Sequence, residues 1–142
     1  MKDLYNRVEF VQAIKPILVL DATVPDAATV DLAGFNSAVI ELSVGVKSAD
    51  AGTITLKAEH SDTTSFAAVA AADIQGATPA EGVIYTIDAD SDDSTSRIVK
   101  FGYVGGKRYL KLTIAEVGAN ANGVILGVTV VKGHGLDVPA IS

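Results

Sequence analysis

The sequence predicts an all-β protein, a single jelly-roll-like β-sandwich with an extended N-terminal arm and an irregular C-terminal tail. Apolar and polar residues alternate with a period of two in several short segments. Polar or glycine-containing turns separate these segments at regular spacing. Hydrophobic residues make up 49% of the chain, and tryptophan is absent. We therefore expect a core of small and β-branched side chains between two sheets.

Residues 8–16 look extended, and Pro16 is a residue that central strands exclude because it has no N–H to donate. We expect residues 1–16 to form an arm and a first edge segment. The sandwich is expected over residues 17–132, and the tail over residues 133–142.

Short apolar runs at residues 17–20 and 27–32 predict the next two strands. Alternation is clearest at residues 40–46 and 54–58, which we expect to pair as a hairpin around the turn at 48–52.

The segment from residue 61 to residue 80 predicts a long crossover, with one helical turn in its alanine-rich part. Residues 83–87 then resume the period of a strand.

A second hairpin is predicted where residues 99–103 and 110–114 flank Gly105 and Gly106. These glycines would supply the positive φ of a tight turn. The apolar run at residues 124–131, which follows a turn at residues 118–123, is the last predicted strand.

Composition excludes several classes of function. The net charge is −6 and Lys and Arg form no run, so the chain lacks an electrostatic footprint for nucleic acid. Cysteine is absent, which excludes disulfides and thiolate chemistry. No apolar run reaches the roughly 18 residues that cross a bilayer, and the first residues do not resemble a secretory signal. We expect a soluble protein made in a cytoplasm.

Two motifs suggest ligands at first sight. The acidic segment Asp88–Asp93 lacks the glycine and the glutamate of a calcium-binding EF-hand loop. It predicts a solvated turn, and divalent-ion binding by another geometry stays open. Gly105-Gly106-Lys107 lacks the other residues of a phosphate-binding loop, so we reject that function.

The two histidines, His60 and His134, have no nucleophile elbow or metal-ligand spacing around them. We expect His60 at a polar strand end and His134 in a loop. The sequence therefore predicts no catalytic residue, no metal ligand and no cofactor. Phe101, Tyr103 and Tyr109 could form an aromatic platform for sugar, although such residues usually fill a sandwich core.

Three stretches of the chain resemble a group of small structural proteins of tailed bacteriophages. They are Glu59-His-Ser-Asp62 with the alanine-rich segment that follows it, Val99–Leu112, and Gly123–Gly135. The resemblance covers about residues 37–135 and concerns strands and turns. It implies a virion component without catalytic activity, of the head decoration or cement type, and it transfers no functional residue.

The partners implied by the resemblance are the major capsid protein and neighbouring copies of this chain, which we expect as a trimer on the capsid surface. We expect residues 1–16 and 133–142 to make many of these contacts. A head–tail connector or a tail component is the alternative within the virion. A carbohydrate-binding β-sandwich is the alternative of another class.

Overall fold

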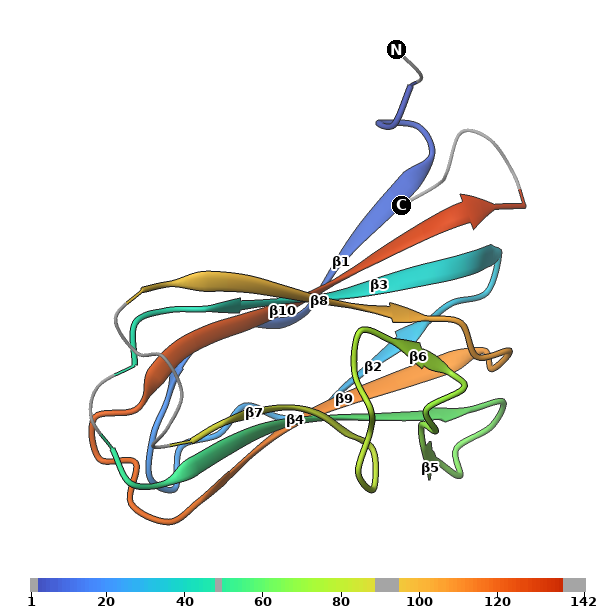
Figure 1. Cartoon of the computed structure of the whole chain (residues 1–142). Coiled ribbons are helices and arrows are strands. Elements are labelled where there is room, and N and C mark those ends of the chain that lie inside the picture. The colour runs from blue at the N-terminus through green and yellow to red at the C-terminus, as the bar shows by residue number, and fades with distance from the viewer. Residues whose placement is uncertain (1–2, 48–49, 89–94, 137–142) are drawn as a thin grey trace.

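A computed structural model of the chain describes residues 3–47, 50–88 and 95–136. This part contains ten strands and no helix, and its strands form two antiparallel sheets that stack as a sandwich (Figure 1). The all-β sandwich expected from the sequence is therefore confirmed. Because the described residues contain no helix, none of their segments is a helix that could span a membrane.

The strands are β1 (Val8–Val19), β2 (Ala28–Asp31), β3 (Phe35–Val44), β4 (Thr53–Ser61), β5 (Ala67–Ala68), β6 (Ile74–Gln75), β7 (Val83–Ile87), β8 (Arg97–Tyr103), β9 (Tyr109–Val117) and β10 (Val124–Gly135). Sheet A has the order β1-β10-β3-β8-β6. Sheet B has the order β2-β9-β4-β5, and β7 pairs with the same edge of β4 as β5 does. The four strands β1-β10-β3-β8 thus cover β2-β9-β4-β7, which is the jelly-roll arrangement.

The two predicted hairpins do not form. β3 lies in sheet A between β10 and β8, whereas β4 lies in sheet B beside β9. β8 and β9 are separated in the same way, so the connection through Gly105 and Gly106 arches from one sheet to the other. The period-two pattern was interpreted correctly, but it is the same for strands that pair locally and strands that cross the sandwich.

Gly105 and Gly106 also have no positive φ, contrary to the sequence-based prediction. Gly105 meets a different constraint, because a Cβ atom placed there would lie 2.6 Å from the Tyr103 hydroxyl. The glycine lets the loop pass closely over a buried aromatic ring.

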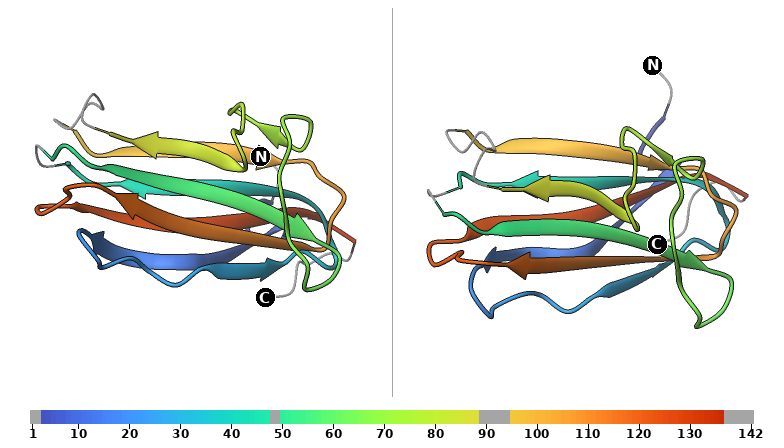
Figure 2. Two further views of the ribbon diagram at one scale, coloured as in Figure 1. Left: turned by 90° about the horizontal axis from the view of Figure 1, so that it is seen from below. Right: turned by 60° about the horizontal axis from the view of Figure 1, so that its bottom comes forward.

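The crossover from residue 61 to residue 82 connects the two sheets at one end of the sandwich (Figure 2). It contributes β5 to sheet B and β6 to sheet A, and it contains no helix but a hydrogen-bonded turn, in which the N–H of Asp73 donates to the carbonyl of Ala70. The helix propensity of its alanines is overridden, because Val69 and Ile74 are buried in the core.

The first strand begins at Val8 and pairs with β10 along its length, with register shifts near Ile14 and Ile17. It is an edge strand, as the presence of Pro16 requires. β1 therefore continues across the expected boundary at residues 16 and 17, and β10 continues to Gly135. The N-terminal segment and the adjoining ends of β1 and β10 project beyond the sandwich (Figure 1).

The core between the sheets consists mainly of Val, Leu and Ile side chains, as the composition predicts. Phe101 and Tyr103 point into it and are each only 2% exposed. Lys132 is the charged residue on the inner side of β10, where it forms an ion pair of 3.1 Å with Glu9.

Candidate binding surfaces

A groove lies on the outer face of sheet B, where β9 begins and β4 ends. It has a volume of about 420 Å³. Leu110, Leu112 and Ile114 of β9 face the core, so the alternation of the strand places Tyr109 on the outer face. The groove is lined by Thr29, Asp62, Thr63, Thr64, Phe66 and Tyr109. We call it the Phe66–Tyr109 groove.

Hydrogen bonds within the loop that follows β4 build one wall of this groove. The Ser61 hydroxyl donates to the carbonyl of Ser65 at 2.6 Å and accepts from the N–H of Thr63 at 2.9 Å. Asp62 connects the loop to the β8–β9 connection, because it accepts from Lys107 Nζ at 2.7 Å and from the N–H of Arg108 at 3.2 Å. The hydrogen bond from Lys107 is the main reason that the pKa of Asp62 lies below its usual value.

Cationic side chains lie against both aromatic rings of the groove. Arg108 lies 4.9 Å from the centre of the Tyr109 ring, and Lys111 lies 5.3 Å from the centre of the Phe66 ring. Arg108 also donates two hydrogen bonds to Asp31, at 3.1 and 2.9 Å, and these lower the pKa of Asp31 to about 2. Each ring of the groove therefore makes a cation–π contact in addition to its packing contacts.

The outer face of sheet A is a second surface of a different kind. Five large apolar side chains lie exposed on its four long strands, namely Phe10, Leu18, Val39, Ile98 and Ile125. Ile98 is 74% exposed, Phe10 68% and Ile125 57%. A polar row crosses the middle of the face, formed by Gln12, Thr129, Glu41 and Lys100 in strand order. We call this surface the docking face.

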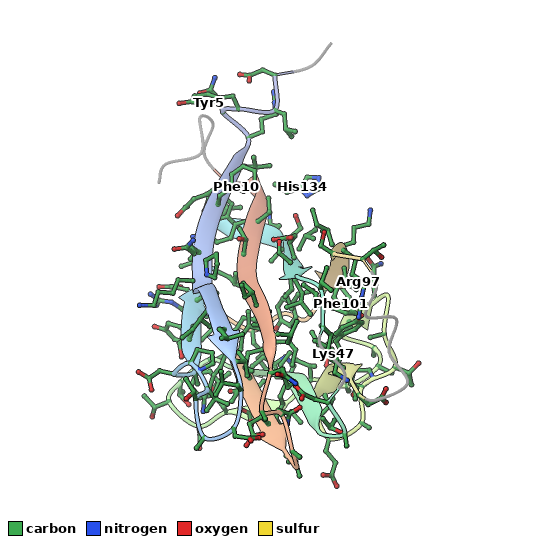
Figure 3. The ribbon with its side chains drawn as sticks, turned by 90° about the vertical axis from the view of Figure 1, so that its left-hand side faces the viewer. Tyr5, Phe10, Lys47, Arg97, Phe101 and His134 are labelled. Atoms are coloured by element: carbon green, nitrogen blue, oxygen red, sulfur yellow. The ribbon has the colours of Figure 1, made fainter. Side chains whose placement is uncertain are left out.

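The docking face is hollowed at both ends. One hollow, of about 620 Å³, lies between Val39 and Val131 on the sheet and Leu4 and Arg7 of the N-terminal segment. The other, of about 580 Å³, is lined by Ser43, Gly45, Ile98, Ile125 and Gly127, among others. Figure 3 shows Phe10 and His134 toward the same end of the molecule, with Tyr5 farther out on the N-terminal segment.

The two histidines are far apart and neither forms a triad among the described residues. His60 lies in β4, where Nδ1 is 3.0 Å from the Tyr103 hydroxyl and Nε2 is 4.0 Å from an Asp73 carboxylate oxygen. His134 lies within β10 rather than in the predicted loop, and its Nδ1 is 2.7 Å from the Ser37 hydroxyl. No group of three or more His, Cys, Asp or Glu side chains suited to a metal ion occurs within the described ranges.

The aromatic, acidic and basic residues singled out from the sequence lie in different parts of the fold. Phe101 and Tyr103 fill the core, as residues at such positions usually do, so the alternative of a platform of three aromatic residues is excluded, and of the three only Tyr109 faces outward. The carbonyl of Asp88 accepts a hydrogen bond from Lys47, and the rest of the acidic segment lies outside the described residues. Lys107 is paired with Asp62.

Sequence reasoning missed Phe66 and the docking face. Phe66 follows five polar residues in a segment interpreted as a loop edge, and the pairing of β4 with β9, which brings Phe66 and Tyr109 into one groove, is not encoded locally. The sequence does contain an indication of the docking face. Val39 and Ile125 stand at positions where the outward residues of a half-exposed sheet are polar.

The chain matches no protein-family model and no curated protein. Among solved structures, it is similar to the CBM22-1–GH10 modules of Clostridium thermocellum xylanase 10B complexed with xylohexaose, with 14% identity and a TM-score of 0.49. That match covers 95% of this chain but only 26% of the xylanase chain.

Two further structures are similar to the chain. One is the EclA C-terminal domain, a sugar-binding protein, with 9% identity, a TM-score of 0.41, and 93% and 81% of the two chains covered. The other is the carbohydrate-binding module CBM6cm-2 of Cellvibrio mixtus lichenase 5A in complex with cellotriose, with 16% identity, a TM-score of 0.37, and 89% and 97% covered. Similarity at this level assigns neither a ligand nor a site to this chain.

Proposed function

We propose that this chain is a non-enzymatic structural component of a tailed-phage virion, of the head decoration or cement type. The observation that carries the proposal is the docking face. A soluble monomer rarely exposes so many large apolar side chains on one sheet, and a face of this kind is characteristic of a protein–protein interface. The resemblance of the sequence to small virion proteins supplies the kind of assembly.

The arrangement of the molecule suits such a role. The docking face and the groove lie on opposite sides of the sandwich, because they belong to the outer faces of the two sheets. The N-terminal segment, which carries the exposed side chains of Leu4 and Tyr5, projects beside the docking face. Partner proteins can therefore be contacted by one sheet and one arm while the other sheet stays in solvent. The major capsid protein is the partner we propose for the arm.

Copy number in purified phage particles tests this proposal. The chain and the major capsid protein are quantified together by mass spectrometry with isotope-labelled peptides. A fixed simple ratio between them supports a decoration or cement protein. About a dozen copies per particle would instead indicate a connector or tail ring, because a closed ring holds a small fixed number of subunits. Absence of the chain from the particles would overturn the proposal.

A second candidate function is carbohydrate binding in the Phe66–Tyr109 groove. Aromatic faces carry partial negative charge and attract the C–H groups of a sugar ring. The hydroxyls of Thr29 and Thr64, which have no partner within the described residues, are free to bond sugar hydroxyls. The groove thus combines an apolar platform with polar groups that fix orientation, as small-molecule sites do.

Glycan-array binding tests the second candidate. The variants Phe66→Ala and Tyr109→Ala should lose binding, because each removes one ring of the groove. Tyr5→Ala is the matched control, since it removes an exposed aromatic ring on the N-terminal segment. Equal binding by all three variants, or none by the unaltered chain, would exclude the groove as a sugar site. Tyr103 is unsuitable for this test because its substitution would disturb the core.

A further inference from the structure

We propose that the docking face is covered by a second copy of this chain, in a two-fold dimer that packs sheet A against sheet A. This inference rests on the proposed assembly role and names one of its partners. The charge, the relief and the area of the docking face all suit a second copy of the chain.

The charge of the face permits self-association. The whole chain carries −6, which opposes the association of identical molecules. The polar row of the docking face, however, contains one carboxylate, Glu41, and one ammonium, Lys100, on adjacent strands at the same register position. The middle of the face is therefore close to neutral. Two copies can meet there without placing like charges directly opposite each other.

The raised and hollow parts of the docking face match those of a second copy when the two copies are related by one particular two-fold axis. A two-fold axis in the interface, running along the strands between β10 and β3, places each β1 over the β8 of the second copy. The registers then set Phe10 opposite Gly102 and Ile125 opposite Gly45. Two of the five exposed apolar side chains of the face thus meet glycines, and Val39 meets Val131 in an apolar contact. Glu41 faces Thr129, so each carboxylate meets a hydroxyl.

The area of the face is close to that of a stable interface. Four strands about 4.8 Å apart, and about ten residues long at 3.3 Å per residue, give roughly 600 Å² in flat projection. Side-chain relief adds to this value. A standard protein–protein interface buries about 800 Å² on each partner.

The mass of the purified full chain tests the dimer. Sedimentation equilibrium should give twice the chain mass of 14.6 kDa. Ile98→Lys and Phe10→Lys should each halve that mass. Both side chains are exposed, so the fold should persist, which far-UV circular dichroism checks. Thr86→Lys, on the outer face of sheet B, is the matched control and should leave the dimer intact.

Covalent trapping through a single cysteine detects the dimer even where its affinity is weak. Because the natural chain has no cysteine, any thiol cross-link in a single-cysteine variant joins two molecules. Val39→Cys lies beside the proposed axis, and a short thiol-specific bifunctional reagent should cross-link it to the same residue of the second copy, since stacked sheets about 10 Å apart are too distant for a direct disulfide. Thr86→Cys should stay monomeric.

A monomeric mass for the unaltered chain, or a dimer that survives Ile98→Lys and Phe10→Lys, would overturn the inference. A trimeric mass would also overturn it and would favour the three-fold arrangement expected from the resemblance. Copy number in particles separates the two proposals. A monomer that is present in particles refutes only the dimer, and a dimer that is absent from them refutes only the virion role.

Discussion

Lys132 and Glu9 form the most deeply placed ion pair of the described residues, with side chains only 9% and 15% exposed. Lys132 also lies 4.7 Å from the centre of the Phe35 ring and donates to the carbonyl of Asp31. Removing one member of a buried pair leaves the other charge without compensation, which is far more costly than removing both. This pair therefore fixes the end of the sandwich where β1 meets β10.

We predict that Lys132→Ala lowers the free energy of unfolding by about 3 kcal/mol. The double variant Lys132→Met with Glu9→Gln should recover most of that loss, because no charge is then left buried. Urea denaturation followed by circular dichroism measures both. A cost of less than about 1 kcal/mol for Lys132→Ala would show that Glu9 is solvated when its partner is removed.

Asp31 makes the stability of the protein depend on pH in the acid range. Its pKa is lowered from 3.8 to about 2, mainly by the hydrogen bonds from Arg108. A carboxyl group with a lowered pKa binds protons more weakly in the folded state than in the unfolded state. Its contribution is therefore complete above pH 3.8 and is lost as the pH falls toward 2.

We predict that Asp31→Asn flattens the loss of stability between pH 3.8 and pH 2, and leaves the remaining pH profile similar in shape. The effect should be small, because about half of the Asp31 side chain is exposed and water screens the pair. Melting temperatures measured across this range provide the comparison. An unchanged acid slope in Asp31→Asn would contradict the assignment.

At the scale of elements, the close contact between β1 and the start of β10 depends on glycine. Gly123 has a φ of +65°, and a Cβ atom there would lie 2.1 Å from the carbonyl oxygen of Val19. A side chain at this position thus meets both an unfavourable backbone conformation and a clash with backbone that cannot rotate away.

We predict that Gly123→Ala destabilises the protein by about 2 kcal/mol or more. Gly106→Ala is the matched control, since a Cβ atom at Gly106 meets nothing within 4 Å and its φ is not positive. Thermal unfolding should rank the two variants clearly. Equal melting temperatures would mean that the turn before β10 relaxes without cost.

The strands themselves could be predicted from the sequence, whereas their partners could not. The alternation in residues 54–58 and 110–114 reflects which side chains face the core, and the structure confirms it in β4 and β9. The alternation expected over residues 40–46 holds only to Val44, where β3 ends, because Val46 is exposed and Lys47 is buried. Alternation carries no information about which sheet a strand joins. That choice is made by contacts far apart in sequence, such as β3 with β10, so the nearest-neighbour hairpins were wrong.

The binding surfaces were predictable to a smaller extent. Tyr109 was identified, but its neighbour Phe66 comes from another element, and only the pairing of β4 with β9 brings the two together. Exposed residues such as Ile98 looked like ordinary strand residues, because their apolar character suits a core equally well.

The whole molecule is a sandwich with two unlike outer faces. Sheet B presents Thr, Lys and Glu side chains and a groove, whereas sheet A presents an apolar face with glycines between its bulky residues. This asymmetry is the basis for our account of the chain as an assembly protein. Within an assembly, sheet A would be covered and sheet B would remain in water.

Hydroxyl-radical footprinting of the chain in assembled phage particles tests that claim most directly. The oxidation of Leu18 and Ile98 is compared between particles and the monomeric variant Phe10→Lys, which keeps both residues, and Tyr109 on the outer face of sheet B serves as the internal reference. We predict strong protection of the sheet A residues and little change at Tyr109. Equal oxidation of Ile98 in the two states would show that the docking face stays exposed, and would contradict the account.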